Sequence, residues 1–390
     1  MKIYNRAALL IFFSFGFFTL TSFKTPHASP VNAIDPLFNQ HPKIQVAILL
    51  DVSNSMDGLI EQAKAQLWNM VTIMGKTRCG DATPQIEIAL YEYGRSNNDV
   101  KEGYVKQLSG FTSDLDKLSQ TLFNIKTYGG DEYCGQVMYT SLTHLNWDSS
   151  AKNYKVIFIA GNEDFLQGNV TYTKACMQAK KKGVIINSIY CGDRLQGIQE
   201  HWNITGECGG GSYTNINQDA KMDHIATPYD DQLFVMNEQL NNTYIAYGAM
   251  GRSNARQQAE MDEKNYSMNK SAGINRISVK GKKNLYKNNH WDLVDAEETN
   301  SDIINKVDMK TLPDSLQNKT REELKQIVRS KNAQRSAIQQ QIATTSIKRE
   351  EYIKAEKAKL SGNKTIATLE TEIAKIIKQQ AKRFNMIVTE

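Results

Sequence analysis

The stretch Val46–Met56, VAILLDVSNSM, constrains the fold of this chain more than any other. Its five consecutive apolar residues predict a β-strand that is buried on both faces, as in a parallel sheet covered by helices. Asp51, Ser53 and Ser55 then follow at alternate positions, where the strand ends. In a loop at the carboxyl end of a strand, this spacing can direct one carboxylate and two hydroxyls to a single point. Hard cations such as Mg²⁺ bind oxygen ligands of this kind.

Predicted strands and helices alternate from residue 44 to about residue 250. Strand patterns occupy residues 44–51, 85–93, 104–108, 154–160, 184–190 and 211–216. Apolar residues at helical spacing occupy residues 57–74, 114–125, 133–147, 172–182 and 192–205. This alternation implies right-handed crossovers and an α/β fold, in which helices flank a doubly wound, mostly parallel sheet. Such sheets bind ligands at the carboxyl ends of their strands, where Asp51 is expected.

A buried strand followed by Asp-x-Ser-x-Ser-Met and a helix resembles the von Willebrand factor A (vWA) domain family and its metal-ion-dependent adhesion site. The resemblance covers residues 44–250. The segments Gly161–Phe165, Ala175–Cys176 and Ile189–Asp193 are similar to a secreted bacterial vWA subgroup of unassigned activity. The resemblance implies a Rossmann-like domain whose first loop binds Mg²⁺ or another divalent cation. It also implies that a threonine from a second loop and an aspartate from a third complete the site.

The second loop resembles Lys126–Gly135, which contains a Gly-Gly-Asp segment before a predicted helix. The resemblance assigns Thr127 as the threonine ligand, with Asp131 and Glu132 nearby as alternative oxygen donors. The alternative is a glycine turn followed by acidic residues that are favourable at a helix N-terminus.

The third loop departs from the family pattern. The family has Thr-Asp-Gly after its strand, whereas this chain has Ala160–Asp164, AGNED, so the aspartate position falls on Gly161. Asn162, Glu163 or a water molecule is then expected to complete the site. The alternative for the whole first loop is structural: Asp51 caps the next helix, and the serines satisfy amides of the turn.

Residues 1–28 are predicted to form a signal peptide or an uncleaved signal anchor, because Lys2 and Arg6 precede the apolar run Ala7–Phe23. Residues 29–43 are predicted to be a linker. The protein is therefore expected in the periplasm or outside the cell, tethered to a membrane only if the first segment is retained.

The five cysteines are disulfide candidates, because an exported chain meets an oxidising compartment. Two bridges are expected, and the odd number leaves at least one thiol free or paired between chains. Cys134, Cys176 and Cys191 are expected near the carboxyl ends of strands, and Cys79 and Cys208 near the opposite edge. A 176–191 or 134–191 bridge is thus favoured over 79–134, and the connectivity stays open.

The chain changes character after about residue 250. Residues 251–310 are predicted to be a connector with a small β-hairpin over 278–286. Residues 311–390 show two helical patterns, separated at 361–363, that predict a helical hairpin or coiled-coil-like tail. From Arg252 onward, 27 basic and 18 acidic residues give a charge of +9, against −4 for the rest. Because the two signs are interleaved, solvated helix faces are favoured over nucleic-acid binding.

The chain lacks the sequence motifs of several enzyme classes. It contains no His-Glu-x-x-His, Gly-x-Ser-x-Gly, phosphate-loop or dinucleotide fingerprint. Binding is therefore predicted rather than catalysis, with an acidic group of a partner protein on the cation and homo-oligomerisation through residues 318–388. The alternatives are a cell-envelope scaffold with a vestigial metal site that acts through its helical tail, and a Mg²⁺-dependent hydrolase that uses residues 129–132 and 162–164.

Overall fold

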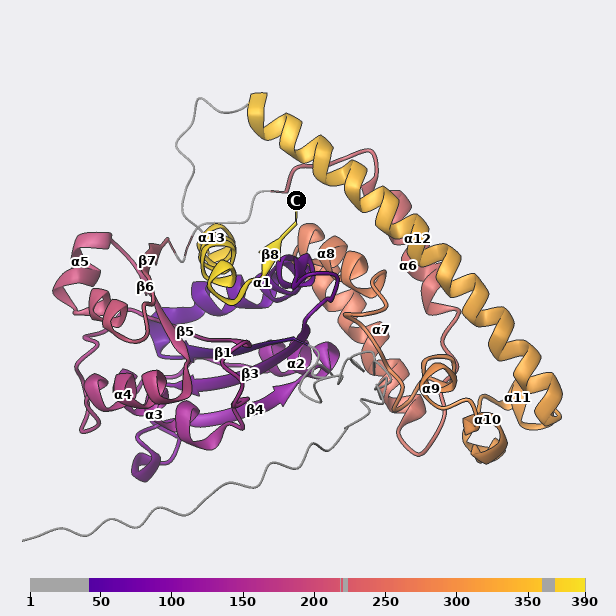
Figure 1. Ribbon diagram of the computed structural model, residues 1–390, viewed down its shortest axis with the longest axis horizontal. Helices are drawn as coiled ribbons and strands as arrows, with labels where there is room; N and C mark the ends of the chain where they lie inside the picture. The colour runs from indigo at the N-terminus through magenta and orange to yellow at the C-terminus, as the bar shows by residue number, and fades with distance from the viewer. Residues whose placement is uncertain (1–41, 218, 220–223, 360–368, 390) are drawn as a thin grey trace, which may run out of the picture. The chain divides into compact units, whose positions relative to one another are not determined.

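The structure is a computed structural model that describes residues 42–217, 219, 224–359 and 369–389 (Figure 1). The predicted signal segment, residues 1–28, and nearly all of the predicted linker lie outside the described residues. Within the described ranges, no helix has both the length and the apolar character needed to cross a membrane.

A six-stranded sheet with the strand order β4-β3-β1-β5-β6-β7 forms the centre of the fold. Its strands are β1 Lys43–Asp51, β3 Gln85–Tyr93, β4 Lys106–Thr112, β5 Tyr154–Gly161, β6 Ile185–Cys191 and β7 Tyr213–Ile216. All neighbouring pairs are parallel except β3 and β4, where the edge strand β4 runs antiparallel with an irregular register. The predicted doubly wound, mostly parallel α/β sheet is confirmed.

Helices cover both faces of the sheet (Figure 1). Residues of β1 alternate between the two faces. Val46 and Leu50 pack in one apolar cluster with α1, and Ala47 and Leu49 pack in a second cluster with α3. The helices of this region are α1 Asp57–Gly75, α2 Leu115–Phe123, α3 Cys134–His144, α4 Tyr172–Lys182 and α5 Arg194–Gln199. The strand is buried on both sides, as its unbroken apolar run requires.

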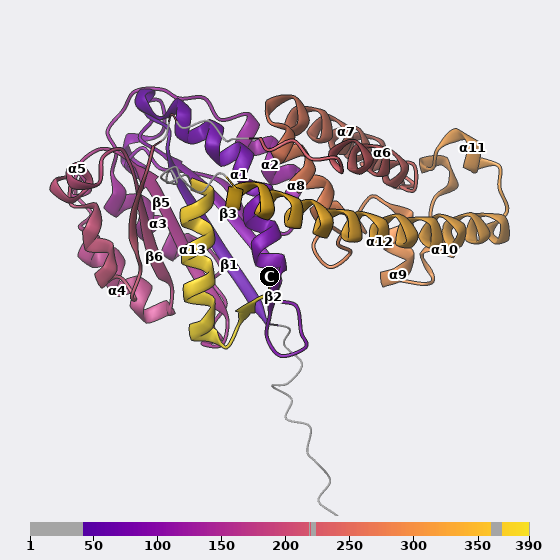
Figure 2. The same ribbon diagram turned by 90° about the horizontal axis from the view of Figure 1, so that it is seen from above.

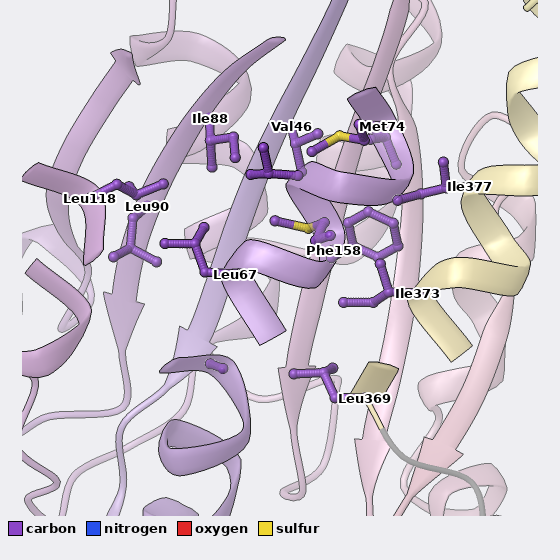
Figure 3. Packing of buried hydrophobic residues seen from close by; sticks show 14 of the residues in the cluster. Val46, Leu67, Met74, Ile88, Leu90, Leu118, Phe158, Leu369, Ile373 and Ile377 are labelled. Carbon is purple, nitrogen blue, oxygen red and sulfur yellow. The ribbon is translucent and has the colours of Figure 1, made fainter. Parts of the chain in front are cut away.

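The last helix, α13 Leu369–Ala381, packs against the sheet beside α1 (Figures 2 and 3). Its apolar residues join the α1 cluster: Leu369, Ile373, Ile376, Ile377 and Ala381. The short strand β8, Ile387–Val388, then pairs antiparallel with β2, Thr77–Arg78, directly after α1. The expected helical hairpin is therefore wrong, because the apolar stripe of α13 covers the sheet rather than the preceding helix.

A buried amide holds α13 in register with the sheet. Gln380 is 1% exposed, and its Nε2 donates to Asn187 Oδ1 at 2.7 Å. Its Oε1 accepts from Tyr154 Oη at 3.0 Å and from Asn187 Nδ2 at 3.1 Å. Because unpaired amides are costly to bury, these bonds favour one register of the helix.

The residues between β7 and α13 form a mainly helical region. Its elements are α6 Asp230–Asn241, α7 Gly251–Met268, α8 Lys270–Lys280, α9 Leu293–Thr299, α10 Ile303–Lys306, α11 Asp314–Gln317 and α12 Arg321–Lys359. The small β-hairpin expected over residues 278–286 is wrong. Asn269 caps a helix there by accepting from the amide of Ala272, and Ile274 and Ile277 are buried on one face of it.

The apolar face of α12 is used within the chain. Leu324 and Val328 pack with α9, and Ile342 packs with α6 and α8. The same face buries Arg335, which contacts Asp292 and Asp295 at 2.6 Å each, and Arg349, which contacts Asp230 at 2.9 Å. The expectation that the basic residues lie on solvated faces is wrong for these two arginines, because each is nearly buried and paired.

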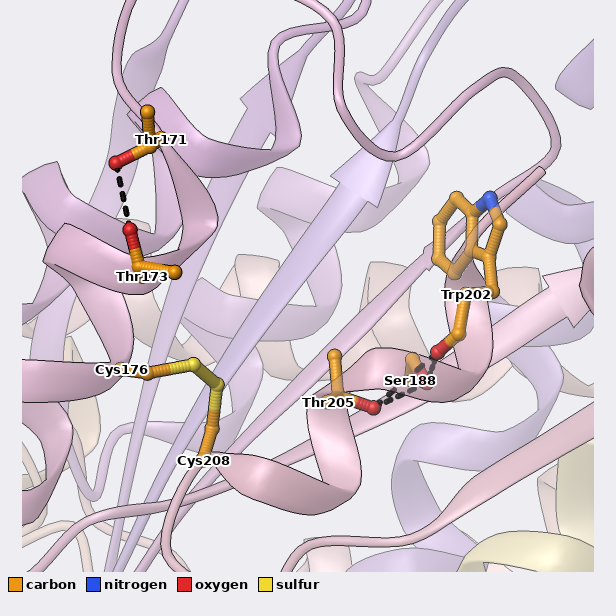
Figure 4. Close-up of a disulfide and its surroundings, with 7 residues drawn as sticks. All are labelled: Thr171, Thr173, Cys176, Ser188, Trp202, Thr205 and Cys208. Carbon is orange, nitrogen blue, oxygen red and sulfur yellow. Dashed lines mark hydrogen bonds between the residues drawn. A yellow bond between two sulfur atoms is a disulfide. The ribbon is translucent and has the colours of Figure 1, made fainter.

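A single disulfide joins Cys176 to Cys208 in the described part of the chain, and the Cα atoms of the pair are 4.6 Å apart (Figure 4). Cys79, Cys134 and Cys191 are free. The expected pairing of Cys191 with Cys176 or Cys134 is wrong. Cys191 belongs to the apolar cluster on the α1 face, whereas Cys134 and Cys176 belong to the cluster on the opposite face. The sheet itself lies between these thiols.

Candidate functional site

The first loop leaves β1 at Asp51, forms a short 3₁₀ turn over Asn54–Met56 and continues into α1. Asp51 is fully buried, and its Oδ1 accepts from the amide of Ser53 at 2.8 Å. The hydroxyls of Ser53 and Ser55 are 3.3 Å apart. Asp51 does not cap α1, whose N-cap residue Met56 makes no side-chain bond. The structural alternative, in which Asp51 caps the next helix, is therefore wrong, although one oxygen of Asp51 satisfies a turn amide.

The second oxygen of Asp51 is satisfied poorly at best: the backbone amide of Asn162 lies close enough to lower the pKa of Asp51, but it makes no hydrogen bond of normal geometry. Among the described residues, Asp51 Oδ2 is buried without a hydrogen-bond partner, and so is Asn162 Oδ1 in the third loop. Asn162 Nδ2 donates to the Ser55 hydroxyl at 3.3 Å, so the first and third loops meet. A buried acceptor without a partner indicates a missing water molecule or ion, because an unsatisfied polar atom is costly to bury.

Glu132 brings a second carboxyl group to this point from the loop before α3. It is 7% exposed, hydrogen-bonded to the Ser53 side chain, and close enough to Asp51 that their charges interact. Gly94 separates the two acids: a Cβ atom there would lie 2.8 Å from Asp51 Oδ1 and 2.9 Å from Glu132 Cγ. Glu132 is therefore the member of the second loop that the structure places at Asp51.

The other predicted donors of the second loop point elsewhere. The Thr127 hydroxyl donates to Asp57 Oδ1 at 2.5 Å, on the first turn of α1. Asp131 accepts from the Tyr133 hydroxyl at 3.2 Å in an exposed position.

In the third loop, the space around residue 161 accounts for a glycine at the position where the family has aspartate. A Cβ atom on Gly161 would lie 2.6 Å from the Tyr93 hydroxyl and 2.9 Å from Asp51 Oδ2. The Tyr93 hydroxyl donates to the carbonyl of Ala160 at 3.0 Å and occupies the space that a side chain would need. Glu163 is exposed, and its charge acts on both Asp51 and Glu132.

Both buried carboxyl groups hold their protons more tightly than usual. Burial raises the pKa of Asp51 from 3.8 to about 7, and the charge of Glu163 adds to the effect. Burial raises the pKa of Glu132 to about 8, and the charges of Asp51 and Glu163 add to it. None of the largest causes of either shift is a cationic side chain. A bound cation would reverse this penalty by favouring the ionised carboxylates.

The donor set suits a hard cation. No group of three or more His, Cys, Asp or Glu side chains in the described ranges could hold a metal. The site instead offers the carboxyls of Asp51 and Glu132, the hydroxyls of Ser53 and Ser55, and the amide oxygen of Asn162. Oxygen donors with few protein carboxylates fit Mg²⁺, which keeps several water ligands, better than they fit structural zinc.

No protein-family model and no curated protein matches the sequence. Solved structures similar to the chain include the SpRpn10 VWA domain, at 15% identity and a TM-score of 0.34 over 45% of this chain and 88% of that one. An aerotolerance-related membrane protein from Bacteroides fragilis gives 15% identity and a TM-score of 0.32, over 45% and 93%. Proximal thread matrix protein 1 from the mussel byssus, solved with a zinc-occupied MIDAS motif, gives 13% and 0.34, over 45% and 42%.

These likenesses concern the fold alone. The strand order and the Asp-x-Ser-x-Ser loop at the carboxyl end of β1 are what the resemblance to the family implied. The chain contains a vWA-like domain. Within the vWA-like domain, the sequence assigned the second loop to Thr127, whereas the structure brings Glu132 to Asp51. Glu132 was predicted only as an alternative donor, because the choice between it and Thr127 depends on the close approach of Gly94 to both acids.

A serine, a histidine and an aspartate also come together outside the vWA-like sheet. His224 Nδ1 lies 3.0 Å from the Ser271 hydroxyl, and His224 Nε2 lies 3.4 Å from Asp230 Oδ2. Asp230 is already held by Arg349 and by the hydroxyl and amide of Thr227. Burial alone would raise the pKa of Asp230, but these bonds outweigh that effect and lower the pKa. The negative charge of Asp230 is therefore already balanced by partners within the helical region.

The raised pKa values predict a pH dependence of stability for the vWA-like domain without metal. In the folded protein Asp51 and Glu132 titrate near pH 7 and 8, against 3.8 and 4.5 for unperturbed groups. Their favourable contribution is complete below about pH 4 and is lost as the pH rises through 7 to 8. For Asp51 alone this corresponds to roughly 4 kcal/mol. In EDTA, the melting temperature of Asp51→Asn should therefore fall less between pH 5 and pH 8 than that of the wild type. Parallel curves would contradict the burial of this carboxyl.

Proposed function

We propose that the vWA-like domain binds a partner protein through a divalent cation held by Asp51, Ser53 and Ser55, with Glu132 as a further ligand or charge partner. One observation carries the proposal: a buried carboxylate oxygen of Asp51 lacks a hydrogen-bond partner among the described residues, next to a second buried acid. Two carboxylates without a cationic side chain balance the charge of one divalent ion.

Each residue has a defined role in this proposal. Asp51 supplies Oδ2, while the amide of Ser53 fixes its other oxygen. Ser53 and Ser55 supply hydroxyls on the next turn, and Asn162 positions Ser55 from the third loop. At Gly161 the third loop contributes no side chain, and the Tyr93 hydroxyl fills that space. A cation bound here would accept an acidic group of the partner as a ligand, because hard cations keep some positions for external oxygens.

We also infer that the protein is exported. The apolar run Ala7–Phe23 follows two basic residues, as in secretory signals. The bridge between Cys176 and Cys208 supports the same inference, because disulfides persist mainly in oxidising compartments.

Calorimetric titration with Mg²⁺ and Mn²⁺ tests the cation site. The wild-type protein is expected to bind one ion, and Asp51→Ala is expected to abolish binding, since it removes the central carboxylate. Asp131→Ala is the matched control, because this exposed acid lies in the second loop but bonds to Tyr133. Absence of binding to the wild type, or equal loss in both variants, would refute the site.

Partner binding is tested separately, by comparing the proteins that co-purify with the wild type and with Asp51→Ala, each with and without EDTA. A partner lost with EDTA and with Asp51→Ala is expected. A partner retained in all four samples would favour the scaffold alternative, in which the helical region makes the contact.

A further inference from the structure

Two adjoining cavities, of about 740 and 500 Å³, are lined by the C-terminal half of α1 and by residues of α8, α12 and α13. We call them together the basic groove. The residues that line both cavities come from α1, α12 and α13 and from the residue that follows α1: Thr72, Ile73, Lys76, Glu350, Lys354 and Lys378. Volumes of this size suit a small ligand rather than a folded partner or a nucleic-acid duplex.

Positive charge gathers in the basic groove from α12, α13 and the turns after α1 and α8. Its lysines are Lys76, Lys282, Lys354, Lys357 and Lys378, and its acidic residues are Glu350 and Glu351. Lys76 contacts Glu350 at 2.6 Å, so one glutamate is already engaged. Arg349 also reaches the groove, but Asp230 balances its charge at 2.9 Å. The described lining therefore contains five lysines and two glutamates, an excess of basic side chains.

Lys282 is the most informative member of this group. It is half-buried just after α8, and none of the ion pairs between described residues includes it. Burial lowers its pKa, and the charges of Lys76 and Arg78 lower it further, although Glu350 opposes them. Repulsion between Lys282 and the neighbouring positive charges destabilises the groove while it is empty. A bound anion would relieve this repulsion.

The rest of the lining suits a phosphorylated ligand. Ser278 and Ser346 share a hydrogen bond of 2.9 Å at the wall, and Asn69 and Asn275 add amide groups. Ile347 is 58% exposed and lies in the same wall, so an apolar part of a ligand also finds a contact. Lysine ammonium groups bind phosphate as point charges without demanding the planar geometry that arginine imposes.

We propose that the basic groove binds a ligand carrying two or more phosphate groups, whose negative charge complements the excess of lysines in the lining. The ligand is either a soluble diphosphate or a lipid phosphate headgroup. This site is separate from the cation site. α1 runs from Asp57 at the cation site to Gly75 at the groove, roughly 27 Å for nineteen residues.

Titration of the full chain with inorganic pyrophosphate tests the groove. The wild type is expected to bind, and Lys282→Gln and Lys378→Gln are each expected to weaken binding by about tenfold, since each removes one charged contact. Lys310→Gln is the control: it removes the same charge from an exposed position on the turn Met309–Thr311, outside the groove.

The melting temperature of Lys282→Gln without ligand should be equal to or above that of the wild type, because the change relieves repulsion between the lysines.

Sedimentation with vesicles distinguishes the two sources. Binding to vesicles that contain cardiolipin, whose headgroup carries two phosphates, but not to phosphatidylcholine vesicles, lost in the Lys282→Gln/Lys378→Gln double variant, identifies a lipid headgroup. Pyrophosphate binding without vesicle binding identifies a soluble ligand. The proposal is overturned if the wild type binds neither probe, or if Lys310→Gln weakens binding as much as the groove variants.

Discussion

Replacing Arg276 by alanine is expected to lower the free energy of unfolding by about 3–5 kcal/mol, because it breaks a buried ion network. Arg276 on α8 is 1% exposed and contacts Asp116 on α2. Its Nε lies 2.5 Å from Asp262 on α7, and its guanidinium lies 4.6 Å from the Trp68 ring on α1. Removing this side chain leaves Asp116 buried without its arginine partner, whereas Asp262 keeps Lys280 at 2.8 Å.

Urea unfolding at pH 7 measures this effect, and Arg256→Ala is the control. Arg256 is an exposed arginine on α7, so its replacement changes the net charge equally and should cost less than about 0.5 kcal/mol. Burial alone would raise the pKa of Asp262, but Lys280 and Arg276 lower it below its usual range. The loss caused by Arg276→Ala should therefore shrink at pH values where the carboxyls become protonated. Equal losses for both variants at pH 7 would show that the network contributes little.

Ile377→Ala is expected to cost about 2–5 kcal/mol, since it leaves a cavity in the main apolar cluster. Ile377 on α13 is fully buried and points toward the α1 face of the sheet, near Met74 and Phe158 (Figure 3). Removal of residues 369–389 is expected to have a larger effect, because it exposes the face that α13 covers and breaks the bonds of Gln380 to Asn187 and Tyr154.

Thermal unfolding of the point variant and sedimentation of the truncated protein measure these effects. Lys375→Ala, at an exposed position of α13, is the control and should leave the melting temperature nearly unchanged. A truncated protein that unfolds cooperatively at the wild-type temperature would show that α13 is dispensable to the sheet. Such a result would also restore the division of the chain into a complete domain ending near residue 250 and a separate tail.

The central strands β1, β5 and β6 were predictable because each one is a short apolar run that needs burial on both faces. The end of β1 was predictable too, because Asp51 is the first charged side chain after the apolar run. The position of α13 was not predictable. An amphipathic helix shows that it must cover something, but its spacing does not say whether the partner is another helix or a sheet.

In the candidate site, too, contacts between neighbours in the sequence were predictable and contacts between distant segments were not. Asp51, Ser53 and Ser55 are neighbours in the chain, so their spacing alone predicted that they meet. Glu132 and the role of Gly161 depend on Gly94 and on the Tyr93 hydroxyl, which approach from β3 and the residue after it. The disulfide was not predicted because the spacing of cysteines does not show on which face of the sheet each thiol lies. That face depends on whether the residue points up or down from its strand and on how the helices pack.

The contact of α13 with the sheet has a consequence for the order in which the molecule is made. β1, β5 and α1 are synthesised first, yet one of their faces is completed only by residues 369–389. During translation, the central sheet of the nascent chain would stay open until this late segment had left the ribosome. A chain that passes a membrane unfolded would benefit from this delay, because its core could close only after residues 369–389 had crossed as well.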